Sequence, residues 1–116
     1  MSKAIPRFSE RLIFLPPTYR RGEKGELADP PKPQLEKLVL DVLKPHKPSV
    51  VELGRALSEL EAVRSVNITL SEVDVDTETV KIVVEGNGLN YEEIKKVIKR
   101  FGAAIHSIDE VVYAIS

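Results

Sequence analysis

Two histidines are the side chains of this sequence best suited to acid–base or metal chemistry. His46 stands between two prolines, and His106 lies near the C-terminus. Imidazole changes its charge near neutral pH, and two histidines with a carboxylate can bind a divalent metal. The candidate ligand-binding residues are therefore His46, His106 and the nearest acids along the flanking strands, Asp41 and Asp109. The structural alternative is that His46 caps a turn and that His106 faces solvent or a subunit interface.

A second group of acids follows in the middle of the chain, at alternate positions: Glu72, Asp74, Asp76 and Glu78. In a strand that stays extended, these four side chains share one side. Hard cations such as calcium are bound by several carboxylate and carbonyl oxygens together. The group is thus a candidate metal site for a divalent cation such as calcium. The glycine and spacing of a calcium-binding loop are missing, and an acidic hairpin turn is the alternative.

The segments that carry these residues alternate between strand and helix patterns. Apolar residues at every second position predict four strands, at residues 35–44, 63–76, 79–86 and 103–115. Helical spacing of apolar residues predicts two helices. The first is opened by Ser49 with Glu52, and the second is capped by Asn90 and followed by Gly102, which suits a left-handed C-terminal cap.

The order of these elements predicts an α+β fold of the ferredoxin-like βαββαβ type. Right-handed crossovers place both helices on one face of a four-stranded antiparallel sheet with strand order 4-1-3-2. The first and fourth strands are then antiparallel neighbours, so His46 and His106 are expected at the same end of the sheet. Alternation places Asp41 on the open face, away from the strand end, which argues against a metal site there.

The open face of the sheet is the predicted contact surface. Val39 and Leu43 alternate with the core residues of the first strand, and Val73, Val75 and Val83 add apolar groups to that face or its extension. We expect such an apolar sheet face to meet another subunit. The long strand at residues 63–76 is also expected to extend past the sheet and to pair with a neighbour.

Residues 1–33 differ in composition from the rest and predict a proline-rich basic arm before a single domain at residues 34–116. They hold six of the eight prolines and a net charge of +3, which leaves −4 for the domain against a total of −1. Three interpretations stay open: a tail without a role or a start codon placed too far upstream, an arm that docks on a neighbouring subunit, and binding of an anionic polymer through "YRRGEK".

Composition removes several classes of function. The 116 residues are 42% hydrophobic and 30% charged, which is typical of one globular domain. The absence of cysteine excludes disulfides, thiol catalysis and iron–sulfur clusters. A net charge of −1 and a third strand without aromatics on its open face disfavour nucleic acid as a partner. No apolar run is long enough to span a membrane and no signal-peptide layout is present, so we expect a cytoplasmic protein.

Three strings give the sequence a family resemblance. "LDVLKPH", "VNITL" and "IHSIDEVV", within residues 37–112, resemble an archaeal family known as domain of unknown function 211. The resemblance implies a small ferredoxin-like domain that assembles into ring-like homo-oligomers and has no established activity. The present chain departs from the family in its long N-terminal arm and in ending at "YAIS".

The function that these observations favour is a homo-oligomeric, non-catalytic domain that binds a small ligand or divalent cation at subunit interfaces in a regulatory role. "GNGLN", beside a predicted helix N-terminus, is suited to hold an anion. One alternative is a structural ring or scaffold whose basic arm reaches a partner. Another is an enzyme that uses His46 or His106 as acid or base, although no positioned partner is identifiable in the sequence.

Overall fold

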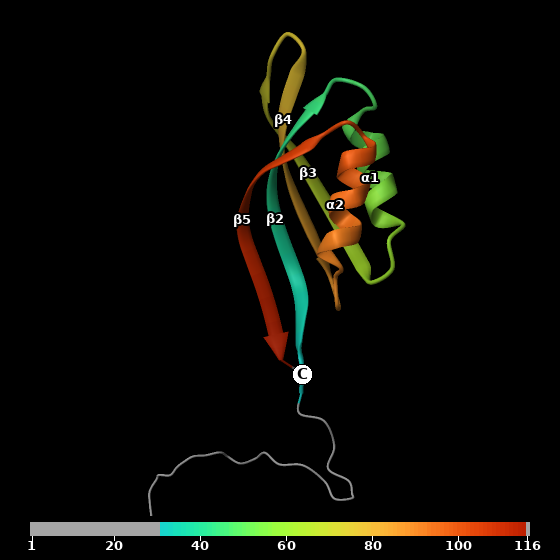
Figure 1. The fold of residues 1–116 in the computed structure, drawn as a ribbon, viewed down its shortest axis with the longest axis vertical. Helices are drawn as coiled ribbons and strands as arrows, with labels where there is room; N and C mark the ends of the chain where they lie inside the picture. Colours follow the sequence, from blue (N-terminus) through green and yellow to red (C-terminus); the bar gives the residue numbers. More distant parts are fainter. Residues whose placement is uncertain (1–30, 116) are drawn as a thin grey trace, which may run out of the picture. The chain divides into compact units, whose positions relative to one another are not determined.

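The computed structural model describes residues 31–115, which form one sheet covered by two helices (Figure 1). The strands and helices are, in chain order, β2 (Pro33–Pro45), α1 (Val50–Ser58), β3 (Val63–Val73), β4 (Thr77–Gly86), α2 (Tyr91–Arg100) and β5 (Ala104–Ile115). The sheet is antiparallel with the order β3-β4-β2-β5, which confirms the predicted ferredoxin-like arrangement. Residues 1–30 of the predicted arm lie outside the described residues.

The core lies between the sheet and the helices, as the strand alternation predicts. Leu40 and Val42 of β2 are fully buried, and so are Val80 and Ile82 of β4. The apolar stripes of α1 and α2 cover them, and the buried members of these stripes are Leu53, Leu57, Ile94, Val97 and Ile98. Burying each such side chain contributes about 1.5–3 kcal/mol. Neither helix among the described residues is long and apolar enough to cross a lipid bilayer.

Both predicted helix starts are confirmed by their capping hydrogen bonds. The backbone N–H of Glu52 donates to Ser49 Oγ at 3.4 Å, and that of Glu93 donates to Asn90 Oδ1 at 3.2 Å. Gly102 follows α2 with a φ of +73°, the left-handed conformation expected at a helix C-terminus. These caps set where each helix begins and ends, and therefore where the adjoining loops lie.

The strand predicted over residues 63–76 ends three residues early. β3 ends at Val73, and the chain reverses so that the N–H of Asp74 donates to the carbonyl of Thr77 at 2.8 Å. We call residues 70–80 the hairpin and residues 73–77 its tip. The hairpin projects beyond the helices at the upper end of the sheet in Figure 1. Val73 and Val75 therefore belong to this projection and not to the sheet face.

The open face of the sheet is less apolar than expected, although Leu43 is exposed on it. Ion pairs cross this face, with Lys37 Nζ 3.3 Å from Glu110 Oε1 and Lys81 Nζ 2.9 Å from Asp109 Oδ2. Val39 is on this face but is buried among its neighbours. The alternation of β2 alone could not reveal this, because the charged partners come from β4 and β5 through the strand register.

Candidate functional site

The first member of the site is a lysine buried in the core side of β2. Lys44 continues the alternation of Leu40 and Val42, and only 1% of its surface is exposed. Its strand partner in β4 is Glu78. Lys44 Nζ lies 3.1 Å from Glu78 Oε1 and donates to the carbonyl of Pro45 at 2.7 Å. A buried ammonium group needs such partners to offset the loss of water.

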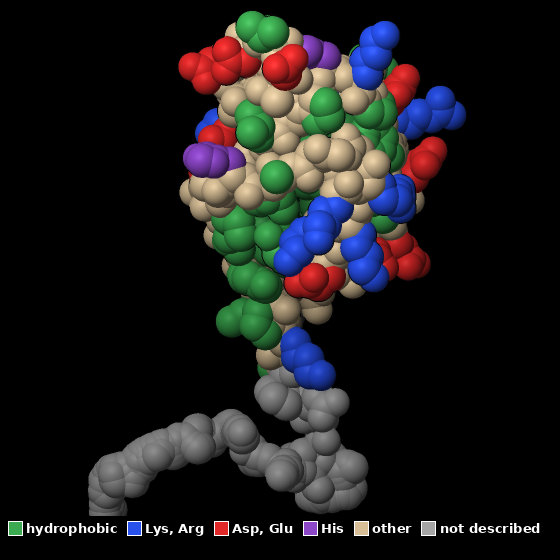
Figure 2. Space-filling model, turned by 45° about the horizontal axis from the view of Figure 1, so that its top comes forward, with side chains coloured by type: hydrophobic (Ala, Val, Ile, Leu, Met, Phe, Trp, Pro, Cys, Tyr) green, Lys and Arg blue, Asp and Glu red, His purple; other side chains and the backbone are tan. Residues whose placement is uncertain are grey.

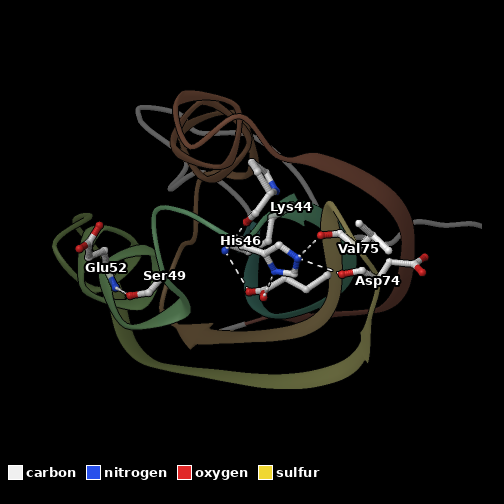
Figure 3. Close-up of polar contacts among 8 residues, drawn as sticks. Lys44, His46, Ser49, Glu52, Asp74 and Val75 are labelled. Carbon is white, nitrogen blue, oxygen red and sulfur yellow. Dashed lines mark hydrogen bonds and ion pairs between the residues drawn. The ribbon is translucent and has the colours of Figure 1, made fainter.

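His46 is the second member of the site, and it lies in the loop between β2 and α1, directly after the end of β2. Its Nδ1 is 3.0 Å from Glu78 Oε2. Its Nε2 is 2.9 Å from the carbonyl oxygen of Asp74 and 3.0 Å from that of Val75 (Figure 3). All three partners are hydrogen-bond acceptors, so both ring nitrogens are best satisfied when both carry a proton. The arrangement therefore suits the imidazolium form of His46.

The electrostatics of the two charged side chains agree with that assignment. The pKa of His46 is raised, chiefly by its hydrogen bond to Glu78 and then by the Val75 and Asp74 carbonyls. The pKa of Glu78 is lowered, first by the hydrogen bond from His46 and then by that from Lys44. The Glu78 carboxylate thus contacts two cationic side chains, and His46 and Glu78 each favour the charged form of the other.

The chemical capacity of this cluster is to hold a segment in place. Lys44 and His46 come from the end of β2, Glu78 comes from β4, and the two carbonyls belong to the hairpin tip. In this arrangement neither His46 nitrogen keeps a lone pair for a metal or for proton abstraction. The structural alternative for His46 was that it caps a turn, and the turn that it holds is the distant hairpin tip.

The structure does not bring the four predicted ligand-binding residues together as one metal site. The histidines do lie at the same end of the sheet, because Val42 near the end of β2 pairs with Ile105 at the start of β5. His106, however, falls where the β2–β5 register shifts, which marks a β-bulge. Asp109 falls at a second register shift.

The two aspartates belong to the open face, away from the helix side on which Lys44 and Glu78 lie. Asp41 is the strand partner of Lys81 and of Ser107. Asp109 accepts hydrogen bonds from Lys81 Nζ at 2.9 Å and from Ser107 Oγ at 2.8 Å. The pKa of Asp109 is lowered, chiefly by the hydrogen bond from Lys81.

The four predicted metal-binding acids do not share one side, because the strand that would align them reverses. Glu72 pairs with Thr79, whereas Glu78 pairs with Val73 in the next register position. Successive pairs point to opposite faces of a hairpin, and Glu78 is already bound to Lys44 and His46. Within residues 31–115, no group of three or more His, Asp or Glu side chains is placed to hold a metal ion. Calcium binding by these acids stays a prediction.

A pocket of about 520 Å³ lies between α2 and β5, and sequence analysis missed it. Lys95 and Lys99, one helical turn apart, line it together with His106, and no carboxylate side chain does. The remaining lining residues are Tyr91, Ile98, Ala103, Ala104, Ile105, Ser107 and Ile108. The four-residue spacing of the lysines was a visible signal, but the bulge that brings in His106 was not.

Comparison with known proteins identifies a family and gives no activity. Residues 36–115 match the model of the family DUF211, described as "Uncharacterized ArCR, COG1888". The chain is also similar to "Uncharacterized protein MJ0319" of Methanocaldococcus jannaschii, with 46% identity over 78 residues. That match covers 67% of this chain and 80% of the relative. The chain therefore belongs to the DUF211 family.

Proposed function

We propose that this protein is a non-catalytic domain that assembles with copies of itself and binds an anionic group in the α2–β5 pocket at the contact between copies. The observation that carries this proposal is the placement of exposed apolar side chains. Nine large hydrophobic side chains are exposed among the described residues, and seven of them lie in two places. Three are on the hairpin, Leu70, Val73 and Val75, and four are on β5, Ile108, Val111, Tyr113 and Ile115.

The four β5 side chains, which we call the apolar edge, lie on a strand at the edge of the sheet. Figure 2 shows hydrophobic side chains gathered along the lower left side of the coloured part of the molecule. An exposed edge strand that also carries apolar side chains is suited to pair with another chain. Proteins that stay monomeric usually protect such an edge with charges, proline or a covering segment.

The ligand part of the proposal follows from the charge of the pocket. Lys95, Lys99 and His106 surround an apolar floor that includes Ile98 and Ile105, and no carboxylate lines the pocket. The two lysine side chains favour an anion over a divalent cation. The pocket shares Ile108 with the apolar edge, so a chain that covers the edge also reaches the pocket.

The enzyme alternative receives no comparable support. A general base must present a free lone pair to its substrate, and both nitrogens of His46 face acceptors that belong to the protein itself. Tethering the hairpin accounts for His46 without a reaction. A binding role is therefore preferred over a catalytic one.

Native mass spectrometry of the full chain tests the proposal, with and without the substitution Tyr113→Lys in the apolar edge. We expect a discrete oligomer for the natural chain and a loss of assembly for Tyr113→Lys. Val51→Lys is the matched control, because Val51 is equally apolar and exposed but lies on α1, away from both surfaces. A natural chain that stays monomeric at micromolar concentration would overturn the proposal.

A further inference from the structure

The hairpin tip and the α2–β5 pocket are complementary in both charge and polarity. Val75, at the tip, is 90% exposed, which is more than any other large hydrophobic residue described. It is flanked by Asp74 and Asp76, and Glu72 precedes them on β3. Residues 74–76 of the tip thus place one apolar side chain between carboxylates, while the pocket is lined by apolar residues and two lysines.

The cations of the pocket are only weakly engaged within the chain. Lys95 Nζ lies at the limit of ion pairing with Glu92, 4.0 Å away, and 5.7 Å from the ring centroid of Tyr91. Lys99 has no ion-pair partner among residues 31–115. An exposed pair such as Lys95–Glu92 contributes little, so both lysine side chains are available to carboxylates of another chain.

The hairpin tip, in contrast, is ordered by hydrogen bonds within the chain. The carbonyls of Asp74 and Val75 accept hydrogen bonds from His46, and the N–H of Asp74 donates to Thr77. A segment that is already ordered loses less conformational entropy when it binds. The cluster of Lys44, His46 and Glu78 therefore gives the projecting tip a defined shape, as expected of a segment that binds another chain.

We propose that the hairpin tip of one copy inserts into the α2–β5 pocket of a second copy, with Val75 on the apolar floor and Asp74 and Asp76 beside Lys95 and Lys99. This inference rests on the proposed function and names the anionic group that the pocket binds. The partner is a second copy because one chain cannot make the contact with itself. β2 lies between the hairpin strands and β5 in the sheet, and bending the tip across would break the pairing of β4 with β2.

The contact joins two unlike surfaces, which limits the symmetry of the assembly. Such a heterologous contact is repeated from copy to copy around a closed ring, or it is made twice between two copies that exchange their hairpins. A stable interface buries about 800 Å² on each partner, more than a hairpin tip supplies. The apolar edge, which begins at Ile108 beside the pocket, supplies the additional surface.

Charge reversal on both sides of the contact tests the inference. The first variant is Asp74→Lys with Asp76→Lys, the second is Lys95→Glu with Lys99→Glu, and the third combines all four substitutions. We expect each double variant to weaken association at least tenfold by analytical ultracentrifugation. We expect the variant with all four substitutions to recover at least half of the lost free energy of association, because its reversed charges are again complementary. Circular dichroism verifies that each variant is folded.

Two single-residue controls reverse a charge of each sign at sites outside the contact. The controls are Lys96→Glu and Glu61→Lys. Lys96 is exposed on α2, and Glu61 is exposed in the turn before β3. Both are expected to assemble like the natural chain. If the natural chain assembles and the hairpin variant assembles equally well, the inference is overturned while the proposed function stands. If only the pocket variant loses assembly, the pocket binds another anion and the inference is again overturned. A monomeric natural chain overturns both.

Discussion

His46 and Glu78 are 32 residues apart in the sequence, and Nδ1 of the one lies 3.0 Å from Oε2 of the other. The opposite nitrogen of the same ring is shared by two carbonyls of the hairpin tip. The end of β2 is thereby tied to the tip of a hairpin that projects from the sheet. The position of His46 between two prolines thus places its ring against Glu78 and the hairpin tip.

The tie predicts a local effect of removing the ring. In His46→Leu, the tip loses both carbonyl contacts, so we expect the amide proton of Asp74, which is bonded to Thr77, to exchange with solvent about tenfold faster. Hydrogen exchange followed by NMR measures this rate. Amide protons at the centre of β2, such as that of Leu40, should keep their natural rates. His106→Leu is the matched control, and equal acceleration in both variants would contradict the tie.

The same contacts predict a pH dependence of stability. The folded-state pKa of His46 is raised, so its contribution is fully present below the unfolded pKa of about 6.5 and is lost as pH rises through the folded value. The folded-state pKa of Glu78 is lowered, so its contribution is present above the unfolded pKa of about 4.3 and is lost as pH falls through the folded value. The cluster is thus strongest between the two unfolded values.

Thermal unfolding at a series of pH values checks this prediction. We expect the difference in Tm between the natural chain and His46→Gln to be largest near pH 5–6 and to shrink as the pH rises above the unfolded pKa of histidine, about 6.5. His106→Gln serves as the comparison, since His106 lies outside the cluster. A difference for His46→Gln that stays constant from pH 5 to 9 would contradict an imidazolium at this position.

The burial of Lys44 predicts that its replacement lowers the free energy of unfolding by an amount that depends on Glu78. Lys44→Met fills the space but removes a charged hydrogen bond to Glu78, so we expect the free energy of unfolding to fall by about 1.5–3 kcal/mol. The double variant Lys44→Met with Glu78→Gln should lose less unfolding free energy than the sum of the losses in the two single variants. In the double variant, both charges of this pair are removed together, so neither side chain is left without its partner. Urea denaturation of the four proteins measures the coupling, and strict additivity would contradict a shared site.

Removal of divalent cations is expected to leave the protein unchanged. Glu78 is bound to two cations of the chain, and its pairing with Val73 places it on the opposite face from Glu72. We therefore expect the Tm to move by less than about 1 °C when a chelator or millimolar calcium is added, since ligand binding to the folded state would raise it. A calcium-dependent rise of several degrees that Glu72→Gln with Asp76→Asn abolishes would establish the predicted metal site.

Much of the fold follows from short-range patterns, because these act within a few residues. Ser49 and Asn90 cap helices by bonding N–H groups three residues ahead, and the alternation around Leu40 marks the buried face of β2. The burial of Lys44 on the same side was found only in the structure. The caps and the alternation depend on neighbours in the chain, so the sequence alone determined the elements, their order and the family.

The site depended on distances that no local pattern contains. Lys44 meets Glu78 only because β2 and β4 pair in one particular register. His106 lines the α2–β5 pocket because a β-bulge shifts the register of β5 there. Glu72 and Glu78 point to opposite faces because the hairpin turns at Asp74. A shift of one residue in register or in turn position moves a side chain to the other face of a sheet. Strand register, bulges and the hairpin turn were decided by the packing of the whole sheet against its helices, and with them the residues that meet.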